Sequence, residues 1–193
     1  MGESDDIDWS ELADEYKKNH RPHAGHFSWE SDRALAEIGV TNEFAAELER
    51  TGRIFFSKVQ HRGEGRDPPD CEALDAHGSR IAIEVTELVD AKAAAAAREG
   101  FPYEHRLWSD DLAQHIQGLI DRKDKLALRD PPYAQYVLLI FSDERGLNAE
   151  LAQKVSVKQK FEATQISRVF LLLSYEPRTQ NYPCFELQTQ LKR

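Results

Sequence analysis

Three acidic residues, Asp70, Glu72 and Glu84, lie close together in the sequence on either side of a predicted turn. Two or three carboxylates, completed by water and substrate phosphate oxygens, are typical ligands of Mg²⁺ in proteins. A divalent cation held in this way lowers the pKa of a bound water and stabilises negative charge on a phosphate. The residue types therefore indicate a Mg²⁺ (or Mn²⁺) site suited to phosphodiester cleavage.

The three acids fall on a predicted β-hairpin. The turn Asp75-Ala-His-Gly78 separates a strand at about 70–74 from a strand at about 80–88. Side chains alternate along a strand, so Glu84 shares one face with Ala82 and Thr86, and the isoleucines around it take the other face. Asp70 and Glu72 share a parity on the first strand.

The register of this hairpin decides whether the acids meet. If the turn centres on His77, Asp70 lies opposite Glu84, with the two Cβ atoms about 4.5–5.5 Å apart. Like charges at that spacing repel, so a divalent cation, a basic side chain or a raised pKa must compensate. The alternative interpretation is a solvated sheet face that carries scattered acids.

The remaining sequence predicts the elements that hold this hairpin. Helices are expected at about 9–18, 31–50 (with a break at Gly39), 91–98, 109–126 and 148–159; strands are expected at 54–60, 136–141, 169–174 and, as a final edge strand, 184–190. Two strands that look buried on both faces, separated by helices, favour an α/β fold with a mixed central sheet flanked by helices.

Composition is consistent with one globular domain over residues 1–193, with residues 1–8 disordered. Hydrophobic residues make up 40% of the chain and charged residues 31%. There is no signal peptide and no apolar run of about 20 residues that could span a bilayer, so we expect a cytoplasmic protein without a membrane partner. A homo-oligomer is left open.

The segment Pro69-Asp70, followed along the chain by Glu84-Val85-Thr86, resembles the signature of the PD-(D/E)XK nuclease superfamily, also called restriction-endonuclease-like. The resemblance covers about residues 42–174. It implies a restriction-endonuclease-like core and a nuclease that cleaves DNA with Mg²⁺ or Mn²⁺. It further implies that Asp70 and Glu84 are catalytic metal ligands, with the backbone carbonyl of Val85 as another possible ligand. Glu72 would assist them.

The sequence departs from this signature at Thr86, where the superfamily has a lysine that orients or activates the attacking water. The lysine is relocated, replaced by another polar group, or lost together with catalysis. Some members carry it on the helix after the third strand, and Lys123 is the candidate there. Lys58, in the predicted strand 54–60, is a weaker candidate. Lys123 continues the apolar stripe of its helix, whereas Lys125 should be solvated; the stripe consists of Leu112, Ile116, Leu119 and Ile120. A snorkelling lysine at a helix end is the alternative.

Other charged residues extend the hypothesis. A third acid often comes from the helix before the sheet in this superfamily, where Glu43 and Glu47 are candidates. Lys58, Arg62 and Arg66 could clasp a phosphate backbone at the mouth of the acidic site, or they belong to an ordinary polar loop. The histidines of the segment 20–26 could bind zinc, although a surface loop is favoured.

Two functions therefore lead, and an enzyme on another α/β fold that uses the acids for different metal chemistry is a third, weaker alternative. The leading hypothesis is a metal-dependent nuclease in which Asp70, Glu84 and Lys123 are catalytic. The alternative is a catalytically inactive module of the same fold that binds nucleic acid or a protein partner. Thr86 and the net charge of −9 favour the alternative, because an acidic protein has no global attraction for a polyanion.

Overall fold

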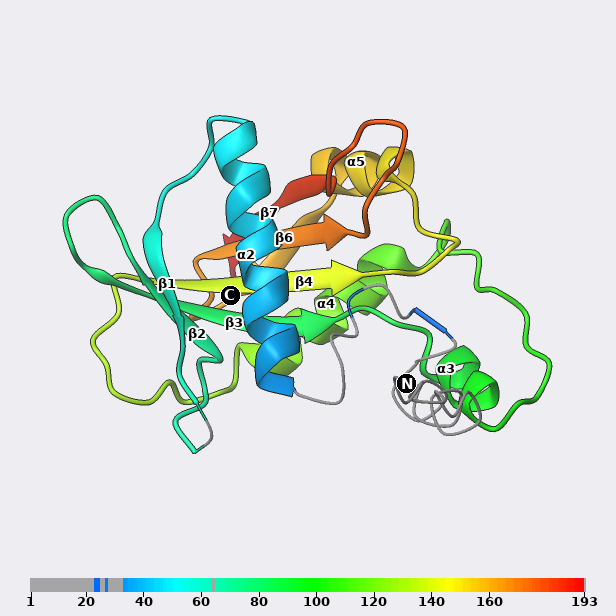
Figure 1. The fold of residues 1–193 in the computed structure, drawn as a ribbon, viewed down its shortest axis with the longest axis horizontal. Coiled ribbons are helices and arrows are strands. Elements are labelled where there is room, and N and C mark those ends of the chain that lie inside the picture. Colours follow the sequence, from blue (N-terminus) through cyan, green and yellow to red (C-terminus); the bar gives the residue numbers. More distant parts are fainter. Residues whose placement is uncertain (1–22, 25–26, 28–32, 64, 193) are drawn as a thin grey trace, which may run out of the picture.

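A computed structural model describes residues 23–24, 27, 33–63 and 65–192. It contains a mixed β-sheet with helices on both faces, which confirms the predicted α/β fold class (Figure 1). In chain order the elements are α2 (Arg33–Arg50), β1 (Ser57–His61), β2 (Cys71–Leu74), β3 (Arg80–Glu87), α3 (Ala91–Arg98), α4 (Leu112–Lys123), β4 (Gln135–Ser142), α5 (Ala149–Lys158), β5 (Lys160–Ala163), β6 (Arg168–Leu173) and β7 (Cys184–Leu191).

The seven strands follow the order β1-β2-β3-β4-β6-β7-β5. The first three form an antiparallel meander, and β3, β4 and β6 run parallel to one another. β7 is antiparallel to β6 but parallel to β5, which lies outside it. The prediction that the last strand forms an edge is therefore wrong. The outer strand β5 is only four residues long, which is too short for a clear periodic signal.

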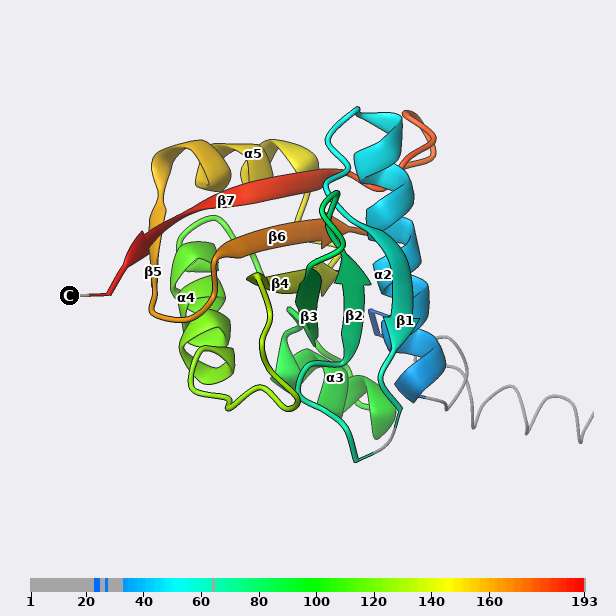
Figure 2. The ribbon, with the colours of Figure 1, turned by 90° about the vertical axis from the view of Figure 1, so that its left-hand side faces the viewer.

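The two faces of the sheet build two separate hydrophobic cores. One core contains Ile81, Ile83 and Val85 of β3 and packs against α2. The other contains Ala82 and packs against α4 and α5. Figure 2 shows α2 on one side of the strands and α4 and α5 on the other. By parity, Glu84 belongs to the face that α4 covers.

Two helix predictions require correction. α2 continues through Gly39 without the expected break, because burial of Val40 and Phe44 outweighs the roughly 1 kcal/mol cost of a helical glycine. α4 begins at Leu112, where Asp111 and not Ser109 is the cap residue. The helix expected at 9–18 lies outside the described residues. Within the described residues, no helix is both long and apolar enough to cross a membrane.

The C-terminal end of α4 is fixed in place by two anchors. The buried carboxylate of Asp124 accepts hydrogen bonds from the backbone N–H groups of residues 164–166, at 2.7–2.9 Å. Burial raises the pKa of Asp124, but these hydrogen bonds outweigh it and lower the pKa below its usual value. The Tyr136 hydroxyl donates to the Lys123 carbonyl at 3.1 Å. The position of Lys123 therefore depends on both anchors.

Replacement of Asp124 by Ala should lower the free energy of unfolding by at least about 3 kcal/mol, because three N–H groups lose a charged acceptor. Chemical denaturation measures this change. Asp121→Ala is the matched control, since it removes one negative charge from the same helix end. Asp121 is more exposed and pairs with Lys192, so little change is expected. An equal effect of both substitutions would contradict the anchoring role.

Candidate active site

The hairpin register brings Asp70 and Glu84 together. β2 and β3 pair Cys71 with Ile83 and Glu72 with Ala82, which centres the turn on His77 as predicted. Continued by one residue, this register sets Asp70 opposite Glu84. Both side chains lie in the protein interior: Asp70 is 1% exposed and Glu84 is 2% exposed. Two buried carboxylates thus face each other at the end of the hairpin.

Each carboxylate accepts one short hydrogen bond, of 2.8 Å or less, through one of its oxygens. Asp70 Oδ2 accepts a hydrogen bond at 2.8 Å from the backbone N–H of Val85. Val85 lies on β3, beyond Ile83, the last residue of β3 that pairs with β2. Glu84 Oε1 accepts one at 2.6 Å from Lys123 Nζ. The other oxygen of Glu84, Oε2, is buried and has no hydrogen-bond partner among the described residues. Such an oxygen is unusual in a folded protein, and it has an unused capacity to accept a hydrogen bond or a metal contact.

The electrostatics of the pair make Asp70 the carboxyl that ionises with difficulty. Burial and then the neighbouring charge of Glu84 raise its pKa to about 7. The Val85 N–H bond and the Lys123 ammonium oppose this shift, while the charge of Glu37 adds to it. The compensation expected for two opposed carboxylates is therefore present in two forms, a basic side chain and a raised pKa.

Lys123 lies where the apolar stripe of α4 predicted it. Its side chain is 22% exposed and reaches across to the β3 strand, so its ammonium sits beside the carboxylate pair. Lys125 is exposed, as expected. Lys123 is the last residue of α4, the second of the two helices between β3 and β4, which is the helix on which the relocated lysine was expected. Its chemical role stays a prediction.

A third acid approaches the pair from α2, but it is Glu37 and neither predicted candidate. Glu37 accepts hydrogen bonds from Arg33 Nε at 2.5 Å and interacts with His61 Nε2 at 2.9 Å. Glu47 instead forms a bidentate pair with Arg50, at 2.7 Å for each contact.

The sequence did contain a signal for Glu37. Its spacing of four residues from Thr41 and seven from Phe44 places it on the inward stripe of α2. The predicted break at Gly39 separated Glu37 from that stripe and hid the signal. Arg33 was missed for the same reason, since it lies one turn before Glu37.

The structure does not bring Glu72 to the carboxylate pair. Glu72 Oε2 lies 2.7 Å from Arg80 and 3.2 Å from Arg62, so two cations already neutralise it. Arg62 is also bonded to Asp130 at 2.5 Å and to the Tyr133 hydroxyl. Glu72 lies on the same face of the hairpin as Asp70, as its parity predicted, but the charged side chains beside it are Arg62 and Arg80. The expected role of Glu72 as a metal ligand therefore receives no support from its position.

The predicted phosphate-binding residues divide into two groups. The side chain of Arg62 is only 6% exposed and is engaged in the cluster around Glu72. Lys58 and Arg66 are exposed. Only these two of the three predicted residues are therefore oriented towards solvent, where a polyanion could reach them.

One of the three N-terminal histidines is described, and it does not lie on a surface loop as expected. His23 is buried, and its Nε2 lies 2.9 Å from Glu144 Oε1. Glu144 also accepts a hydrogen bond from the Asp90 N–H at 2.7 Å. His20 and His26 lie outside the described residues.

The donor set can be compared with the needs of a divalent cation. Among the described residues, no group of three or more His, Cys, Asp and Glu side chains has the geometry of a metal site. Mg²⁺, however, is commonly bound by one or two carboxylates, with water and substrate phosphate as its other ligands. Asp70 and Glu84 fit such a site, and the unpartnered Oε2 of Glu84 is the observation that favours it.

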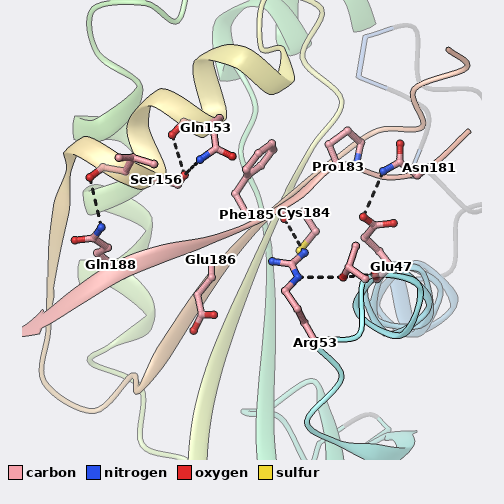
Figure 3. A pocket seen from close by; sticks show the side chains of 12 residues that line it. Glu47, Arg53, Gln153, Ser156, Asn181, Pro183, Cys184, Phe185, Glu186 and Gln188 are labelled. Atoms are coloured by element: carbon pink, nitrogen blue, oxygen red, sulfur yellow. Dashed lines mark hydrogen bonds between the residues drawn. The ribbon is translucent and has the colours of Figure 1, made fainter. Parts of the chain in front are cut away.

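Three cavities of the described structure lie away from this pair. The largest of them, about 560 Å³, lies between α2, α5 and β7, and Figure 3 shows hydrogen bonds among several of the residues that line it. Arg53 donates to the Cys184 carbonyl at 3.1 Å, and Asn181 donates to Glu47 at 3.3 Å. The other two cavities adjoin α4 and α5. Because Arg53, Asn181 and Glu47 of the largest cavity already have hydrogen-bond partners, the unsatisfied carboxylate of Glu84 is the better functional candidate.

Comparison with known proteins adds no family to this description. The chain matches no protein-family model, and it has no significant match among curated proteins or solved structures. The functional argument therefore depends on the site itself.

The raised pKa of Asp70 predicts how Asp70→Asn changes stability. A carboxyl whose folded-state pKa exceeds its unfolded value stabilises the fold at low pH, and this contribution is lost as pH rises to the folded pKa. With the pKa at about 7, the free energy of unfolding of Asp70→Asn, relative to that of the wild type, should rise by about 2–3 kcal/mol between pH 5 and pH 8, at about 1.4 kcal/mol per pKa unit. Denaturation in EDTA at both pH values measures this gain. A difference that does not change with pH would contradict the shift.

Proposed function

We propose that the protein is a metal-dependent nuclease with a restriction-endonuclease-like core, which cleaves DNA phosphodiester bonds by metal-activated water. The observation that carries the proposal is the buried Asp70–Glu84 pair with the Lys123 ammonium 2.6 Å from Glu84. Carboxylates and an amine gathered in this way are suited to holding a cation, a water and a phosphate. A helix, three antiparallel strands, a helical connection and a parallel strand also follow one another as the sequence resemblance implied, with two helices, α3 and α4, in the connection.

Each residue has a distinct role in this proposal. Asp70 and Glu84 would hold Mg²⁺ or Mn²⁺, which lowers the pKa of a bound water and stabilises charge on the phosphate. Lys123 would take the place of the motif lysine by orienting the attacking water and offsetting negative charge. Thr86 lies on the same face as Glu84 but has no basic group. Exposed Lys58 and Arg66 would contact the DNA backbone locally, as the net charge of −9 requires.

A second function is favoured by the charge balance of the same residues. Lys123 pairs with Glu84 and Arg33 pairs with Asp70, so the carboxylates have counter-ions without a metal. In this alternative the chain is a non-catalytic module that binds nucleic acid or a protein partner. Titration calorimetry with Mn²⁺ separates the two, because only the nuclease requires the metal to bind.

The nuclease proposal predicts that Asp70→Asn and Glu84→Gln each abolish Mg²⁺- or Mn²⁺-dependent cleavage of plasmid DNA. Both substitutions keep the side-chain shape but remove a charged metal ligand. Glu144→Gln is a matched control, since Glu144 is also a buried glutamate with one unpartnered oxygen among the described residues. We expect it to retain cleavage. Undiminished cleavage by the first two variants would refute the proposal.

The role of Lys123 is tested separately by Lys123→Met. Loss of a group that orients water and offsets charge typically costs on the order of 100-fold or more in rate. We therefore expect cleavage to fall by about that factor while calorimetry still detects Mn²⁺ binding. Lys125→Met, at the exposed lysine of the same segment, should cleave at the wild-type rate. A rate for Lys123→Met equal to that of Lys125→Met would refute the assignment.

A further inference from the structure

Arg33 closes the Asp70 side of the carboxylate pair. Its Nη2 atom lies 3.3 Å from Asp70 Oδ1 and 3.9 Å from Asp67 Oδ2, while its Nε atom lies 2.5 Å from Glu37 Oε1. The arginine side chain is 71% exposed, although the Asp70 side chain that it contacts is 1% exposed. A solvated cation thus rests against a buried carboxylate that we assign to the metal site.

The four oxygens of the pair differ in how they are held. Asp70 Oδ2 is bonded to the backbone of β3, and Glu84 Oε1 is bonded to the half-buried Lys123 at 2.6 Å. Glu84 Oε2 has no hydrogen-bond partner among the described residues. Asp70 Oδ1 is held by Arg33 through a long contact. The two oxygens that are open or weakly held are therefore one from each carboxylate.

We propose that Arg33 is a displaceable counter-ion, which leaves Asp70 Oδ1 when a divalent cation binds between Asp70 and Glu84. This inference rests on the metal site of the proposed function. The guanidinium then stays attached to Glu37, one turn further along α2. Arg33 thus stabilises the metal-free carboxylate and competes with the metal for the same oxygen.

The geometry explains why a bound metal would displace Arg33 from Asp70 but leave Lys123 on Glu84. A 3.3 Å contact made by an exposed guanidinium is weak, because water can replace it and the ion pair is screened. The 2.5 Å contact between Arg33 and Glu37 is much shorter and lies within one helix, so it keeps the side chain in place. Lys123 is bound more closely and is less exposed, and it occupies the oxygen of Glu84 opposite the open one.

The test is the affinity for Mn²⁺ alone, measured by titration calorimetry at pH 8 on the full chain. Arg33→Gln removes the competing cation and should bind Mn²⁺ about three- to tenfold more tightly than the wild type. Arg50→Gln is the matched control, because Arg50 also lies on α2 and also pairs with a glutamate of its own helix, Glu47. It changes the net charge equally and should bind Mn²⁺ like the wild type.

Each outcome separates this inference from the proposed function. Tighter binding by Arg33→Gln alone supports displacement, even if the wild type itself shows no measurable binding. Wild-type binding that Arg33→Gln leaves unchanged or weakens overturns the inference but not the nuclease. Equal tightening by both variants reduces the effect to overall charge and also overturns it. No Mn²⁺ binding by any of the three proteins overturns the proposed function and the inference together. In a crystal structure with Mn²⁺, a guanidinium still on Asp70 Oδ1 would contradict displacement.

Discussion

Two buried carboxylates face each other at the end of a β-hairpin, and the surrounding structure has to compensate for their charge. Repulsion between Asp70 and Glu84 would destabilise the β2–β3 hairpin if nothing offset it. The compensating cations come from opposite faces of the sheet. Lys123 belongs to α4 on one face, and Arg33 belongs to α2 on the other. Packing of both helices on the sheet therefore supplies the cations that offset this charge, and the raised pKa of Asp70 relieves it further.

This requirement links parts of the chain that are distant in sequence. The end of α4 is held by Asp124, which binds the turn between β5 and β6, and by Tyr136 at the start of β4. The start of α2 is connected to the meander through Glu37 and His61 of β1. Ionic contacts at the site thus depend on strands from both halves of the sheet. A change in any of these supports would alter the charge balance around Glu84.

Much of this arrangement could be predicted from local patterns. The register followed from the Asp75–Gly78 turn, where the Asp75 carboxylate accepts from the His77 and Ser79 N–H groups at 2.8 Å. The position of Lys123 followed from helical periodicity. The mixed sheet followed from apolar runs separated by helices.

Other parts could not be predicted because they depend on tertiary contacts. Parity placed Glu72 on the face of Asp70, but parity does not reveal that Arg62 and Arg80 occupy that end of the face. The helix α2 survives Gly39 because of burial that a propensity scale does not include. For Glu37 and Arg33, that error in one helix boundary concealed two charged neighbours of the site.

The hydrogen bond between Asp70 and the Val85 N–H has a consequence for conformational entropy. One carboxylate oxygen replaces a missing strand partner, so the side chain is fixed by the sheet before any ligand arrives. Immobilising a flexible side chain on binding typically costs about 0.5–1.5 kcal/mol. Asp70 has already lost that freedom during folding. The second oxygen is thus preorganised, because the hydrogen bond to the β3 backbone fixes the orientation of the whole carboxylate.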